Sequence, residues 1–97
     1  MIVNLSKPIT VDGSDQLNLE LRLPTVDDVA EIGYPFLVLQ NDLGTAIQLQ
    51  PKVVLKYAAR LASVPPSSLK TLSLSDLSEL QAAVMSFFGD GAGTSQN

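Results

Sequence analysis

The sequence predicts an α+β domain, in which an N-terminal antiparallel β-hairpin packs against about three α-helices and the C-terminal half is helical. Between residues 17 and 23 every second residue is a leucine and the residues between them are polar, which is the period of a strand with one face in the core. An Asp-Gly pair at 12–13 precedes this stretch and is typical of a tight hairpin turn. From Pro51 onward, apolar residues recur at helical spacing instead.

The chain of 97 residues is long enough for one hydrophobic core and therefore for one domain. We assign this domain to residues 1–88. Residues 89–97 are small and polar, and we expect them to form a disordered tail. Gly89 can adopt the left-handed conformation that ends a helix, so the last helix is expected to stop there.

A hairpin and a short helix account for the N-terminal third. Pro8 is compatible with an edge strand, which needs fewer backbone donors. We expect the alternating leucines to form the buried face of the second strand: Leu17, Leu19, Leu21 and Leu23. Thr25, with Asp28 three residues later, predicts a capping box at the start of the helix. The expected apolar stripe of this helix consists of Val26, Val29 and Ala30.

The segment 36–50 has two interpretations. It forms either a second hairpin that turns at residues 41–45 or an irregular helix. The alternation in "AIQLQ" and the Asn-Asp and Gly residues of the turn favour the hairpin.

A helix is predicted from Pro51, because proline suits a first helical position. Its apolar face consists of Val54, Tyr57, Ala58 and Leu61. A basic stripe, Lys52, Lys56 and Arg60, lies beside that face. We interpret this stripe first as a solvated face or as intramolecular partners of Asp and Glu, and second as a docking surface for an acidic partner. Ser73 or Ser75 is expected to cap the last helix.

The composition argues against several functional classes. The chain contains no Cys and no His, which removes thiolates, disulfides and the commonest general base and metal ligand. A net charge of −4 argues against a general nucleic-acid binder. The longest apolar run, at 36–39, is far too short to span a membrane. No glycine-rich phosphate loop is found. We therefore expect no cofactor, no metal, no nucleic acid and no membrane insertion.

The remaining candidates for catalysis are carboxylates: Asp27 with Asp28, and Asp76 with Glu79. Each pair lies where a helix is predicted to begin, and acidic side chains stabilise exposed helix N-termini by about 0.3–1 kcal/mol each. The structural interpretation is therefore preferred, and a carboxylate enzyme is the most distant alternative.

The candidate partner-binding residues lie on the last helix and on the basic stripe. Hydrophobic residues make up 45% of the chain and the mean hydropathy is +0.23, which favours a partner or self-association. Phe87 and Phe88 project about 100° apart on a helix, so we expect Phe87 in the core and Phe88 partly exposed. The candidate site consists of Leu80, Val84, Met85, Phe88, Lys52, Lys56 and Arg60.

Three segments resemble the phage tail assembly chaperone family of contractile-tailed bacteriophages. They are "LRLPTVDDV" at 21–29, "YAARLASVPPSSLKTLSLSDL" at 57–77 and "AVMSFFG" at 83–89. The positions that carry the resemblance are Arg22, Pro24, Thr25, Leu61, Val64, Pro65, Leu69, Leu72, Asp76 and Phe87.

The resemblance implies a non-enzymatic assembly factor that binds the phage tape measure protein and keeps it soluble during tail tube assembly. It also implies a longer frameshift product of the same gene that shares the N-terminal domain. Such a factor works in the host bacterial cytoplasm and is not expected in the mature virion. From the apolar content we further expect a homo-oligomer. The alternative function is a small structural protein of the phage tail or baseplate.

Overall fold

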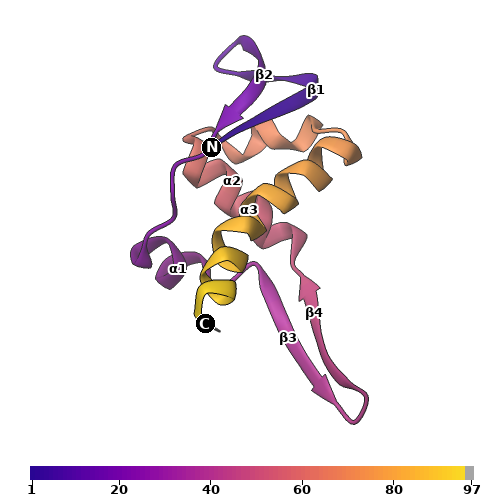
Figure 1. Ribbon diagram of the computed structural model, residues 1–97. Helices are drawn as coiled ribbons and strands as arrows, with labels where there is room; N and C mark the ends of the chain where they lie inside the picture. The colour runs from indigo at the N-terminus through magenta and orange to yellow at the C-terminus, as the bar shows by residue number, and fades with distance from the viewer. Residues whose placement is uncertain (96–97) are drawn as a thin grey trace.

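The chain folds into two separate antiparallel hairpins and a helical body (Figure 1). The computed structural model describes the backbone of residues 1–95 and the side chains of residues 1–88. The elements in chain order are β1 (Ile2–Val11), β2 (Ser14–Glu20), α1 (Val26–Ile32), β3 (Phe36–Asn41), β4 (Gly44–Leu49), α2 (Pro51–Ala62), the 3-10 helix η1 (Pro66–Thr71) and α3 (Leu74–Ser95). The predicted α+β class is confirmed, and the segment 36–50 forms the second hairpin.

The first hairpin turns at the predicted Asp-Gly pair. Asp12 and Gly13 have φ angles of 51° and 81°, so both central residues are left-handed. This geometry matches the right-handed twist of the flanking strands, and Asp-Gly adopts it readily. The local sequence therefore sets the turn between β1 and β2.

An irregular stretch of β1 fastens this hairpin to the last helix. The pairing of β1 with β2 shifts between Asn4 and Ile9. Within that stretch the carboxylate of Asp76 accepts hydrogen bonds from the backbone N–H groups of Ser6, at 2.8 Å, and Lys7, at 3.2 Å. Asp76 thus satisfies backbone donors that the ladder leaves free, which supports its structural interpretation.

The start of α3 agrees with the predicted cap. The hydroxyl of Ser73 accepts a hydrogen bond from the backbone N–H of Asp76 at 3.1 Å. The helix continues through Gly89 to Ser95, so the cap expected at Gly89 is not where α3 ends. Residues 96 and 97 of the expected tail lie outside the described residues, and disorder of 89–97 stays a prediction.

The core lies between the first hairpin and the helices. It is formed by Val3, Leu5, Ile9, Val11, Leu19, Leu21, Val54, Tyr57, Ala58, Ala59, Leu61, Val64, Leu69, Leu80 and Val84. Only two of the four alternating leucines belong to it, because Leu17 and Leu23 are exposed. Leu17 lies opposite the irregular stretch of β1, and Leu23 follows the end of β2, where the period of two no longer fixes the side-chain direction.

Helix α1 begins with the predicted capping box but does not bury the predicted stripe. Thr25 and Asp28 exchange both capping hydrogen bonds. However, Val26 is 84% exposed and Ala30 is exposed, whereas Asp28 is only 1% exposed. The buried side of the helix therefore carries a carboxylate, whose charge is balanced by ion pairs with Arg22 and Arg60.

Candidate protein-binding site

The second hairpin, residues 36–49, extends away from the helical body, and we call it the hairpin arm (Figure 1). Within β3 and β4 every residue is exposed except Phe36, which is half-buried. In the described part of the chain no third strand pairs with either edge. The arm thus offers two faces and two edges to other molecules.

Both faces of the hairpin arm carry apolar side chains. Residues paired across an antiparallel ladder share a face. One face carries the pairs Phe36 with Leu49 and Val38 with Ile47. The opposite face carries Leu37, Leu39 and Ala46. The turn at the tip exposes 97% of Leu43.

An arm of this composition is not expected to be stable by itself in water. An isolated two-stranded hairpin is marginal at best. Exposed apolar side chains in a contiguous patch mark a surface that another protein covers, and unpaired strand edges are templates for further pairing. Among the described residues, the arm is therefore the strongest candidate for a protein-binding surface.

An aromatic cluster joins the base of the arm to the core. The ring centroid of Phe88 lies 6.2 Å from that of Phe36, 5.9 Å from that of Tyr34 and 5.4 Å from that of Tyr57. The hydroxyl of Tyr57 donates a 2.5 Å hydrogen bond to the carbonyl of Gly33. Edge-to-face aromatic pairs each add about 0.5–1.5 kcal/mol beyond their burial, so Phe88 fixes the base of the arm to α3 and α2.

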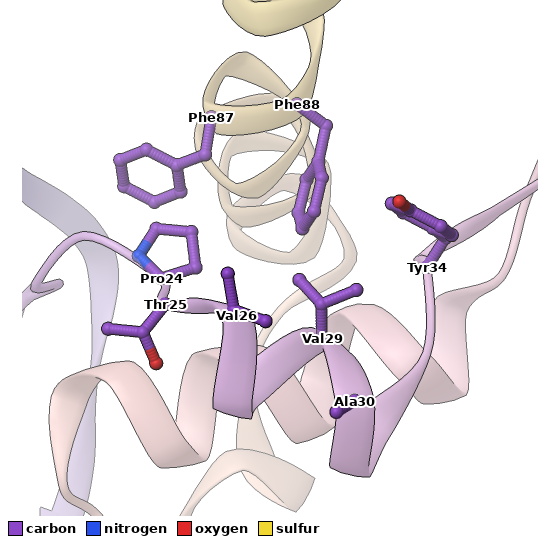
Figure 2. A pocket seen from close by; sticks show the side chains of 8 residues that line it. All are labelled: Pro24, Thr25, Val26, Val29, Ala30, Tyr34, Phe87 and Phe88. Carbon is purple, nitrogen blue, oxygen red and sulfur yellow. The ribbon is translucent and has the colours of Figure 1, made fainter.

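A pocket of about 440 Å³ opens beside this cluster (Figure 2). Its lining residues are Pro24, Thr25, Val26, Val29, Ala30, Tyr34, Phe87 and Phe88. Figure 2 shows Phe87 above Pro24 and Phe88 facing Val29, with Tyr34 at the other side. Because Tyr34 and Phe88 belong to both the pocket and the aromatic cluster, the pocket and the apolar face of the arm form one continuous surface.

The residues predicted for partner binding are divided between core and surface. Leu80 and Val84 are fully buried, so we remove them from the candidate site: α3 packs this face on the first hairpin and α2. Met85 is half-buried. Phe87 and Phe88 are both half-buried and pack against the core. Phe88 is therefore partly exposed as expected, whereas Phe87 is less buried than expected.

The basic stripe is also divided. Lys52 and Lys56 are exposed, whereas Arg60 forms ion pairs with Asp28, Nε to Oδ1 at 2.6 Å, and with Glu31 at 2.5 Å. Arg60 therefore matches the preferred interpretation as an intramolecular partner of acidic residues.

Asp28 is the buried centre of an ion cluster whose two arginines are partly exposed. The guanidinium of Arg22 donates to its two oxygens at 2.8 and 3.0 Å, and the backbone N–H of Thr25 donates at 2.7 Å. The Arg22 hydrogen bonds and then the Thr25 backbone hold the pKa of Asp28 well below its usual range. Hydrogen bonds from the backbone of Ser6, and then of Lys7, likewise lower the pKa of Asp76. Asp28 and Asp76 therefore have separate sets of partners, and these contacts explain both carboxylates by a structural role.

Acid is expected to destabilise the fold through these two groups. A carboxyl whose folded pKa is lowered contributes stability that is present above the unfolded value, about 3.9, and that is lost as the pH falls through the folded pKa. We expect the urea midpoint to fall between about pH 5 and about pH 2. Asp28→Asn should be less stable than the wild type at neutral pH and should lose less on acidification. An equal pH dependence in both proteins would contradict this assignment.

Sequence reasoning missed the apolar side chains of the arm, together with Tyr34 and Phe36. The available signal was the run "FLVL" at 36–39, which places apolar side chains on both faces of a strand. A strand that is apolar on both faces needs cover on both faces, and among the described residues no other element covers the faces of the arm.

One of the three comparisons with known proteins, the scan of family models, found a match. The family model described as "Phage tail assembly chaperone proteins, E, or 41 or 14" matches residues 2–89. The search of curated proteins and the search of solved structures found no match. Within the described residues, none of the helices combines the length and the hydrophobicity needed to span a bilayer.

Proposed function

The chain belongs to the phage tail assembly chaperone family, and on this premise we propose that it binds the tape measure protein and keeps it soluble while the tail tube assembles. The family implies a non-enzymatic role in tail assembly. The single observation that best supports the finer proposal is the hairpin arm, whose apolar side chains are exposed on both faces.

The arm supports binding by burial. Full burial of a Val, Leu or Ile side chain contributes about 1.5–3 kcal/mol. The face that carries Val38 and Ile47 leads into the aromatic cluster and the pocket. An extended or helical client segment that lies along this surface covers the apolar patch. The apolar residues of the client are then also removed from water. Such binding prevents client aggregation without any covalent chemistry.

Co-expression with the tape measure protein of the same phage tests this function. With the wild-type chaperone, we expect most of the tape measure protein in the soluble fraction. A double variant, Val38→Ser with Ile47→Ser, should return the soluble fraction to the level found without chaperone. Leu74→Ser is the matched control, because Leu74 is 82% exposed but lies at the start of α3. Full solubility with the double variant, shown to be folded by circular dichroism, would contradict the proposal.

We also propose that copies of the chain associate through the second apolar face of the arm, the face of Leu37 and Leu39. Because the arm has two apolar faces, one face can bind the client while the other binds a neighbouring copy of the chain. Sedimentation that shows only monomer at micromolar concentrations would argue against this homo-oligomer.

Three further proposals follow from the assembly role. The protein acts in the host bacterial cytoplasm, is absent from the mature virion, and is accompanied by a longer frameshift product that shares its domain. Mass spectrometry of infected cells and of purified particles tests all three. Its presence in the particles would favour the alternative, a small structural protein of the tail or baseplate.

A further inference from the structure

A second apolar groove lies along α2, at a distance in sequence from the hairpin arm. It consists of two adjoining pockets of about 360 and 290 Å³, which share Lys56 and Pro66. The first extends toward the end of α1 and the second lies between α2 and η1. Its apolar lining consists of Ile32, Leu55, Ala59, Val64, Pro66 and Leu69.

Cations surround this apolar lining. Four of the six Lys and Arg residues of the chain line the two pockets: Lys52, Lys56, Arg60 and Lys70. The charge of Arg60 is balanced by Asp28 and Glu31. The three lysines are exposed, and none forms a salt bridge with a residue whose side chain the structure describes. In a protein of net charge −4, this groove is a local concentration of positive charge.

We propose that this groove binds an amphipathic helix of a partner protein in which acidic residues flank an apolar stripe. From Lys52 to Arg60 the groove follows α2 for about 12 Å, which matches about two turns of a helix. Lys52 and Lys56 lie one turn apart, and carboxylates spaced by four residues on the partner meet them in register. The apolar stripe of that helix then packs mainly on the half-buried Leu55 and the exposed Pro66, which lie over the buried Leu69.

The lining favours a protein over a nucleic acid. Sequence-independent binding of single strands uses aromatic side chains on which bases stack. Among the described residues that line the groove there is no aromatic side chain. The groove shares no lining residue with the pocket beside the arm, so this inference does not rest on the tape measure assignment.

Fluorescence anisotropy with the full chain tests the groove. The probe is a synthetic helical peptide of about 18 residues with a leucine stripe flanked by glutamates. We expect it to bind the wild type, and to bind about tenfold or more weakly to Lys52→Glu/Lys56→Glu/Lys70→Glu. Binding should also weaken with added salt.

Two matched controls make the result decisive. Lys56→Glu changes the charge as Lys7→Glu does, but only Lys56 lines the groove, so only Lys56→Glu should weaken binding. A peptide with lysines in place of the glutamates should not bind. Undiminished binding to the folded triple variant, equal effects of Lys7→Glu and Lys56→Glu, or equally tight binding of a single-stranded DNA oligonucleotide would overturn the proposal.

Discussion

Replacement of Leu80 by alanine is expected to lower the free energy of unfolding by about 2–5 kcal/mol. Leu80 is fully buried and packs in the core that α3 forms with the first hairpin. Truncation removes apolar burial and leaves a cavity that the surrounding residues fill only in part. For a domain of this size the loss is a large fraction of the total stability. Urea denaturation followed by circular dichroism measures it.

Leu74→Ala provides the control for this prediction. It is the same substitution in the same helix, but Leu74 is 82% exposed. An exposed truncation of this kind changes stability by about 0.5 kcal/mol or less. If the two variants had equal stability, α3 would not bury the face that contains Leu80.

Replacement of Phe88 by alanine is expected to cost about 2–3 kcal/mol, somewhat less than the roughly 3–5 kcal/mol of a fully buried phenylalanine. Phe88 packs its ring edge-to-face against Tyr34, Phe36 and Tyr57, and all three contacts are lost on truncation. The ring of Phe87 is not part of the aromatic cluster, so Phe87→Ala should lower the free energy of unfolding by less than Phe88→Ala does. This order reverses what the sequence suggested.

The measurement is again urea denaturation, with Phe88→Leu as a conservative variant. Phe88→Leu retains most of the apolar volume and should recover more than half of the lost stability. A greater loss for Phe87→Ala than for Phe88→Ala would show that the aromatic cluster is not the main attachment of the arm.

Local features of the fold were predictable from the sequence because each is set by a few neighbouring residues. The Asp12-Gly13 turn, the Thr25 capping box and the change of period near Pro51 all appear where expected. The second hairpin also forms, since its turn residues and its alternation agree. In these cases local preference and tertiary packing favour the same structure.

The features that the sequence did not predict depend on contacts with other segments of the chain. Asp28 looked like an ordinary first-turn acid, but it is buried because Arg22 and Arg60 converge on it. No spacing rule predicts that pairing, since Arg60 lies on another helix. The assignment of Leu80 to a binding surface failed for a similar reason, because periodicity identifies an apolar face but not what covers it.

Hydrogen–deuterium exchange in the presence and absence of the tape measure protein tests the central claim, that the hairpin arm is the client-binding element. In the free chain the arm has few buried contacts, so its amides should exchange quickly. On client binding we expect the slowing of exchange to be greatest at residues 36–49 and around Tyr34 and Phe88. Client binding that slows exchange elsewhere but leaves residues 36–49 unchanged would contradict the account.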